Sequence, residues 1–127
     1  MHSLPRTLPR ICVALGLPSA SQLQRAAERE YKDGSTFLEF RLDYLTDPAA
    51  GIDVIRKFRR TFPDAYILAT CRHHEAAGHF KGSIEQQVKI LEDALRAGAT
   101  FVDLEDEVAA KRAYEQIVGI WSADAIE

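Results

Sequence analysis

Four short apolar runs, each followed by a segment with helical spacing, restrict the fold of this chain more than any other feature. The apolar runs cover residues 10–15, 36–43, 65–71 and 100–105, and the helical segments cover 19–32, 47–60, 83–97 and 106–118. The continuous apolar run at 10–15 is typical of a buried strand, and in 36–43 apolar residues alternate with charged ones, as on a strand with two different faces. Strands that alternate with single helices predict right-handed crossovers and a parallel sheet.

Capping signals mark the ends of the expected helices. Ser19 and Ser83 are each followed, three residues later, by a glutamine, which is the pattern of a capping box. Gly98 follows the third helical segment, where a glycine commonly ends a helix. Within 83–97 the apolar residues recur at intervals of three and four, so we expect one apolar stripe that packs on a sheet.

Such a chain can form either a doubly wound open sheet or part of a closed barrel. The turn after 10–15 carries one glycine, Gly16, so the chain has no dinucleotide-binding fingerprint there. Polar groups follow the second, third and fourth strands, where a (β/α)₈ barrel carries its chemistry. We therefore expect an α/β fold, the first four βα units of a TIM (β/α)₈ barrel, with 1–9 as a lead-in, 10–119 as a partial barrel domain and 120–127 as a tail.

The overall composition excludes several classes of partner. The net charge is −3, so no basic excess indicates binding to nucleic acid or to an acidic membrane surface. No apolar run approaches the roughly 20 residues of a membrane helix, and the first residues lack the apolar core of a secretory signal. Cys12 and Cys71 both lie in apolar runs, and we expect reduced, buried thiols in a cytoplasmic protein, with a disulfide as the less favoured alternative.

The second apolar run contains three charged residues on one face. Glu39, Arg41 and Asp43 alternate with apolar residues, and side chains two apart on a strand point the same way. Charges on a buried strand are costly unless they pair or bind a ligand. One interpretation is a row of ion pairs that closes a barrel layer, in which Asp43 serves only to hold Arg41.

Further polar residues at the ends of later strands favour a binding site instead. Arg72 follows the third strand, and Asp103 and Glu105 alternate along the fourth. Parallel strands bring these ends to one rim. Asp103 and Glu105 are expected to support the arginines rather than to act as an acid/base pair.

Three blocks of residues together resemble one known family, the type I 3-dehydroquinate dehydratases. The blocks are Glu39-Phe-Arg41-Leu-Asp43, Ala69-Thr70-Cys71-Arg72 with Glu75 and Gly78 behind it, and Phe101-Val-Asp103-Leu-Glu105. The family shows Glu-x-Arg-x-Asp on strand two, Thr-x-Arg with a nearby Glu-Gly-Gly after strand three, and Asp-x-Glu on strand four. The resemblance extends over residues 10 to about 110, which is the first half of a barrel of about 250 residues.

The resemblance implies a lyase of the shikimate pathway, which serves aromatic amino acid biosynthesis. A lysine forms a Schiff base with the ketone of 3-dehydroquinate, a histidine moves protons, and no metal or organic cofactor is needed. By the same resemblance, Glu39, Arg41 and Arg72 would bind this small-molecule substrate. Glu75 would hydrogen-bond the catalytic histidine.

The chain departs from the family pattern in several places. Glu75 follows Arg72 by three residues instead of four, the glycine pair reads Ala77-Gly78, and Ala14 stands where relatives can offer a serine. The strand-five histidine and strand-six lysine of the family have no counterpart, so we expect this chain to be inactive alone. The alternatives are a non-catalytic sugar-acid-binding or regulatory remnant of that barrel, and an unrelated barrel lyase or isomerase.

Two further expectations concern the third loop and the sheet edges. His73, His74 and His79 lie near Glu75, but their spacing matches no standard zinc pattern, so we expect a polar loop or a lid rather than a metal site. Half a barrel leaves its first and fourth strands unpaired on one side. Unpaired edges associate, so the expected partner is a second copy, giving a homodimer, or the remaining barrel half.

Overall fold

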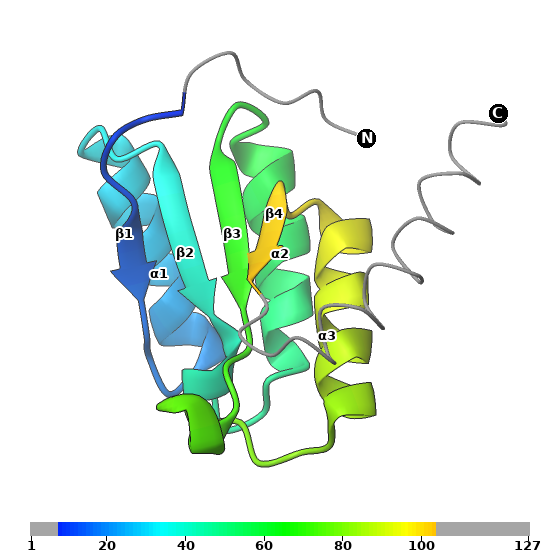
Figure 1. The fold of residues 1–127 in the computed structure, drawn as a ribbon. Helices are drawn as coiled ribbons and strands as arrows, with labels where there is room; N and C mark the ends of the chain where they lie inside the picture. The colour runs from blue at the N-terminus through cyan, green and yellow to red at the C-terminus, as the bar shows by residue number, and fades with distance from the viewer. Residues whose placement is uncertain (1–7, 104–127) are drawn as a thin grey trace, which may run out of the picture.

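A computed structural model of the chain describes residues 8–103, in which four parallel strands alternate with three helices (Figure 1). The strands are β1 (Val13–Leu15), β2 (Phe37–Arg41), β3 (Tyr66–Thr70) and β4 (Phe101–Asp103), and the helices are α1 (Ala20–Lys32), α2 (Ala50–Thr61) and α3 (Ile84–Ala97). Short 3₁₀ turns, η1 (Leu42–Tyr44) and η2 (His74–Ala76), follow β2 and β3. The expected fourth helix, Glu105 and the expected tail lie outside the described residues.

The sheet is singly wound, which distinguishes the two closures considered from the sequence. Its strand order is β1-β2-β3-β4, all pairs are parallel, and the three helices lie on one face (Figure 1). A doubly wound sheet would reverse its strand order and carry helices on both faces. The barrel prediction is therefore confirmed over the open sheet. Within residues 8–103, no helix combines the length and apolar character that crossing a bilayer requires.

The two faces of the sheet differ in character, as strand alternation requires. Leu38 and Phe40 of β2 are fully buried and belong to the core on the helix side, together with Ile67 and Ala69 of β3. Glu39 and Arg41, which alternate with Leu38 and Phe40 along β2, point to the opposite face. The helices do not cover that face, which corresponds to the inner side of a barrel.

The strands are shorter than the apolar runs. β2 ends at Arg41 because β3 ends at its register partner Thr70, and beyond this point no ladder partner remains. Asp43 therefore lies in η1 and not on the strand face with Glu39 and Arg41, which corrects the expectation from simple alternation. β1 likewise contains only the three residues that pair with β2.

The expected capping signals are present with one difference. Ser83 and Gln86 form a complete capping box at α3. At α1, Ser19 accepts a hydrogen bond from the backbone of Gln22, but the Gln22 side chain contacts the Ser19 hydroxyl instead of its backbone N–H, so this box is half formed. Gly98 ends α3 at φ 120°, a conformation that favours glycine.

A buried arginine joins the amino-terminal ends of β3 and β4 to α2. Arg59 is 9% exposed, and its guanidinium donates to the carbonyls of Ala65 at 2.6 Å, Pro63 at 2.9 Å and Gly98 at 2.9 Å. It also donates to the Thr100 hydroxyl, at 3.0 Å. Burial lowers the pKa of Arg59, because removing the cation from water disfavours its charged form. Helical spacing alone does not predict these contacts, because their acceptors come from outside α2.

The two cysteines differ in exposure, so the expectation that both are buried was wrong for Cys12. Cys71 is buried directly after β3, whereas Cys12 is exposed, and no disulfide joins the two within residues 8–103. Cys12 lies just before β1, an edge strand that begins only at Val13, so neighbouring elements do not enclose it. Partial burial of the thiol and the negative charge of Glu39 raise the pKa of Cys12.

This difference in exposure predicts selective thiol chemistry. In the native chain we expect a thiol reagent to label one site, Cys12, and the Cys12→Ala variant to remain unlabelled until it is unfolded. The thiolate is the reactive form, so a raised pKa makes labelling slow at neutral pH. Glu39→Gln should accelerate labelling at pH 8, whereas Asp93→Asn on α3 should not. Mass spectrometry after timed alkylation measures both effects, and equal labelling of Cys71 would contradict the burial.

Candidate active site

The carboxyl ends of three strands place polar side chains in one row. Arg41 of β2 is in register with Thr70 of β3, and Thr70 is in register with Asp103 of β4. Two residues before Arg41 on β2, Glu39 accepts a hydrogen bond of 2.6 Å from the Thr70 hydroxyl. Thr70 is fully buried, so this bond holds the Glu39 carboxylate in place on the face that the helices do not cover.

Arg41 and Asp43 form a two-pronged ion pair at the end of β2. Arg41 Nε and Nη2 donate to the two carboxylate oxygens of Asp43 at 3.1 and 2.9 Å. The Arg41 side chain is 14% exposed and that of Asp43 is 0% exposed. The hydrogen bonds that Arg41 donates to the Asp43 carboxylate raise the pKa of Arg41. The Tyr44 ring lies 4.9 Å from the guanidinium carbon, a distance at which its π face attracts the cation.

Arg72 forms a more open pair with Asp103. Arg72 Nη2 donates to Asp103 Oδ2 at 3.0 Å, and the two side chains are 34% and 36% exposed. The Nε atom of Arg72 is buried and has no hydrogen-bond partner among residues 8–103. A buried donor without a partner costs about 1–3 kcal/mol. An acceptor atom supplied by a bound molecule would remove this cost.

A single backbone amide links the two arginine pairs. The N–H of His79 points to the Asp43 carboxylate at 3.2 Å and to the carbonyl of Arg72 at 3.1 Å. Arg41 and Arg72 therefore lie at the same rim, connected through Asp43 and one amide. The buried side chain of Gln87 adds support from α3 by donating to the carbonyl of Cys71 at 2.7 Å.

The loop after β3 depends on one glycine. A Cβ atom at Gly78 would lie 2.1 Å from the carbonyl oxygen of Arg72, so any side chain at this position would displace the backbone. Ala77 adopts φ 66°, a left-handed conformation that costs a non-glycine residue about 1–2 kcal/mol. Of the expected glycine pair, only the second member is thus required by contact.

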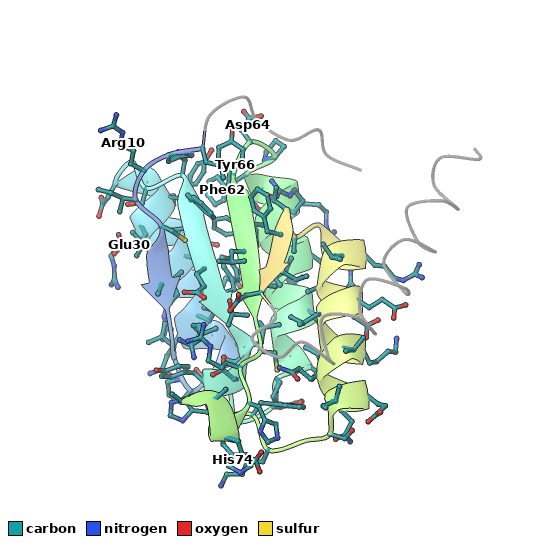
Figure 2. All side chains as sticks on the ribbon, in the orientation of Figure 1. Arg10, Glu30, Phe62, Asp64, Tyr66 and His74 are labelled. Atoms are coloured by element: carbon teal, nitrogen blue, oxygen red, sulfur yellow. The ribbon has the colours of Figure 1, made fainter. Side chains whose placement is uncertain are left out.

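The structure brings most of the predicted residues together. Glu39, Arg41, Asp43, Arg72 and Asp103 gather at the carboxyl ends of β2, β3 and β4. Glu75 lies in η2 at the same end, exposed, and Figure 2 shows its neighbour His74 at the opposite end of the sheet from Asp64 and Tyr66. The bond from Thr70 to Glu39 and the contacts of the His79 amide were not predicted. The register of Thr70 with Arg41 could have identified the first, but no sequence signal identifies the second.

Comparison with known proteins gives one consistent family. The family model described as type I 3-dehydroquinase matches residues 11–123. A 3-dehydroquinate dehydratase of Desulfotalea psychrophila is 38% identical over 96 residues, which are 76% of this chain and 39% of that protein. One of Methanothrix thermoacetophila is 37% identical over 105 residues, which are 83% of this chain and 42% of that protein. The chain thus spans about two fifths of the length of these relatives.

A solved structure supports the fold. The 3-dehydroquinate dehydratase of Enterococcus faecalis superposes with a TM-score of 0.70 at 20% identity. The superposition covers 84% of this chain and 48% of the other. This likeness in backbone shape agrees with a chain that forms about half of a larger barrel.

Proposed function

We propose, since the chain belongs to the type I 3-dehydroquinase family, that residues 8–103 supply the amino-terminal half of a substrate site for 3-dehydroquinate. One observation above all supports this proposal. Two arginines at one rim are each held by a carboxylate, and the buried Nε of Arg72 lacks an acceptor within residues 8–103. A ligand that carries a carboxylate and hydroxyl groups matches this set of donors.

The three residues that we propose contact the substrate, Glu39, Arg41 and Arg72, have different roles. Arg72 donates to acidic or hydroxyl oxygens of the substrate, because its pair with Asp103 is partly open to solvent. Glu39, fixed by Thr70, accepts a hydrogen bond from a substrate hydroxyl. Arg41 is more enclosed, and its pair with Asp43 fixes the direction of its remaining donors.

The proposed reaction removes water from 3-dehydroquinate to give 3-dehydroshikimate. A lysine forms an imine with the ketone and releases water, the adjacent carbon loses a proton, the hydroxyl leaves with a proton, and hydrolysis frees the lysine. The lysines at 32, 57 and 89 lie on helices, and Lys81 lies in the loop before α3. We propose that the reacting lysine and histidine come from outside residues 8–103, that Glu75 orients the histidine, and that this chain alone is inactive.

Borohydride trapping with 3-dehydroquinate tests the division of roles. We expect no covalent adduct on this 127-residue chain and an adduct on a longer version that carries a strand-five histidine and a strand-six lysine. An adduct on the chain itself would overturn the proposal. Trapping that fails in every longer version would favour the non-catalytic binding remnant.

Binding measurements test the assigned residues. We expect weak binding of 3-dehydroquinate to the chain by calorimetry or NMR, and a loss of at least tenfold in Arg72→Ala, since one charged hydrogen bond contributes about 1.5–3 kcal/mol. Arg56→Ala on α2 is the matched control, because Arg56 pairs with Asp53 on the surface. Equal affinity of the two variants would remove Arg72 from the site.

The sheet edges suggest the remaining partner. β1 and β4 each pair with one strand among the described residues, and the chain spans about two fifths of its relatives. We propose that a second copy or the other barrel half covers these edges. We also propose that the protein acts in the cytoplasm. Analytical ultracentrifugation checks the homodimer, and a stable monomer at high concentration would exclude it.

A further inference from the structure

A second cluster of functional side chains lies in η2, beside the candidate active site. His73, His74 and Glu75 each offer one ligand atom, and these atoms lie within 4.8 Å of one another. We propose that these three side chains bind a divalent transition metal ion of the Zn²⁺ or Co²⁺ type. The proposal does not depend on the proposed dehydratase function.

Hydrogen bonds to carbonyls orient both imidazole rings. Nε2 of His73 lies 3.0 Å from the carbonyl oxygen of Gly82, and Nδ1 of His74 lies 3.2 Å from that of Phe80. A carbonyl only accepts, so these nitrogens carry the hydrogens, and in the neutral rings the lone pairs are on Nδ1 of His73 and Nε2 of His74. Histidines that bind metals usually donate their second N–H to such a carbonyl.

The backbone holds the cluster in a defined turn. The N–H groups of Ala76 and Gly78 donate to the carbonyl of His73, and the N–H of His74 donates to that of Phe80. The two imidazole rings lie 4.4 Å apart between centroids. The loop therefore loses little conformational entropy when a metal binds, because its backbone is already held by these hydrogen bonds.

Closing the site requires the three ligand atoms to move closer together than 4.8 Å. Metal–ligand distances of about 2.0–2.2 Å bring ligand atoms to about 3–3.5 Å from one another. Glu75 is exposed, so its side chain can rotate toward the two imidazoles, which keep their hydrogen bonds to the carbonyls of Gly82 and Phe80. One contact that the metal would replace is the bond from the Glu75 N–H to Nδ1 of His73, which is long at 3.3 Å.

The donor set selects the class of metal. Two imidazoles and one carboxylate suit Zn²⁺, Co²⁺ or Ni²⁺, whereas Ca²⁺ and Mg²⁺ require oxygen ligands. The sequence predicted no metal because three consecutive ligands match no standard spacing. They can converge only where the chain turns tightly, and η2 supplies that turn.

Titration of the full chain with Co²⁺ and Zn²⁺ tests the site, in a Cys12→Ala background that removes the exposed thiol. We expect one Co²⁺ per chain with visible d–d absorption, displaced by Zn²⁺. His74→Ala and Glu75→Gln should each weaken binding by about tenfold or more, as changes at metal sites commonly do.

The control is His79→Ala, which removes an imidazole outside the cluster, keeps the backbone amide of this residue and should leave the metal affinity unchanged. Circular dichroism confirms that every variant is folded. Binding below stoichiometric amounts, unchanged affinity in His74→Ala, or loss of binding in His79→Ala would overturn the proposal.

Discussion

Arg59→Met is expected to lower the free energy of unfolding by about 4 kcal/mol. The substitution keeps an apolar stem of similar length but removes donors to the carbonyls of Ala65, Pro63 and Gly98 and to the Thr100 hydroxyl. Each buried acceptor left without a donor costs about 1–3 kcal/mol, and partial hydration reduces the sum. Urea unfolding followed by circular dichroism measures the change.

The neighbouring residue supplies the control for this experiment. Arg60 follows Arg59 on α2 but is exposed, so Arg60→Met should change the stability by no more than about 0.5 kcal/mol. Arg59→Lys should lie between the two, because an ammonium keeps the charge but loses the planar fork of donors. A loss below about 1 kcal/mol in Arg59→Met would show that the carbonyls do not depend on this side chain.

The role of Arg59 also shows where sequence reasoning reached its limit. Helical spacing indicates which side of α2 is buried, because that pattern is local. The partners of Arg59 come from Ala65, Gly98 and Thr100, which only the folded sheet brings together. A cation that binds carbonyls without a carboxylate leaves no complementary charge in the sequence to find.

The strands show the same division between local and distant causes. The four strands, their parallel arrangement and the shared face of Glu39 and Arg41 could be predicted, since apolar runs and alternation are local. The end of β2 could not, because it depends on where β3 ends at Thr70. The exposure of Cys12 likewise depends on the position of β1 at the sheet edge.

The candidate site was predicted better than its supports. Charged residues on apolar strands stand out in a sequence because burial makes them costly. The amide of His79, which joins Asp43 to the loop after β3, carries no side-chain signal at all. The arginines could therefore be named in advance, whereas the contacts that fix their geometry required the structure.

Asp43→Ala is expected to destabilise the chain by about 3–4 kcal/mol and to abolish ligand binding. The carboxylate is 0% exposed in its side chain and bonds to Arg41 twice and to the His79 amide once. Removing one partner of an enclosed ion pair leaves the other charge without compensation, which costs about 3–5 kcal/mol. The loop that follows Arg72 would also lose the hydrogen bond from the His79 amide to η1.

Asp103→Ala is the matched comparison, because it removes the carboxylate from the other arginine at the same rim. The Arg72–Asp103 pair is about one third exposed on both sides, so its loss should cost no more than about 1 kcal/mol. Asp43→Asn provides a milder variant, since an amide oxygen can still accept from the His79 N–H. Urea unfolding of the three variants, with calorimetry against 3-dehydroquinate, tests the ranking. Equal losses in Asp43→Ala and Asp103→Ala would mean that burial does not distinguish the two pairs, and that Asp43 does not hold Arg41 in its binding position.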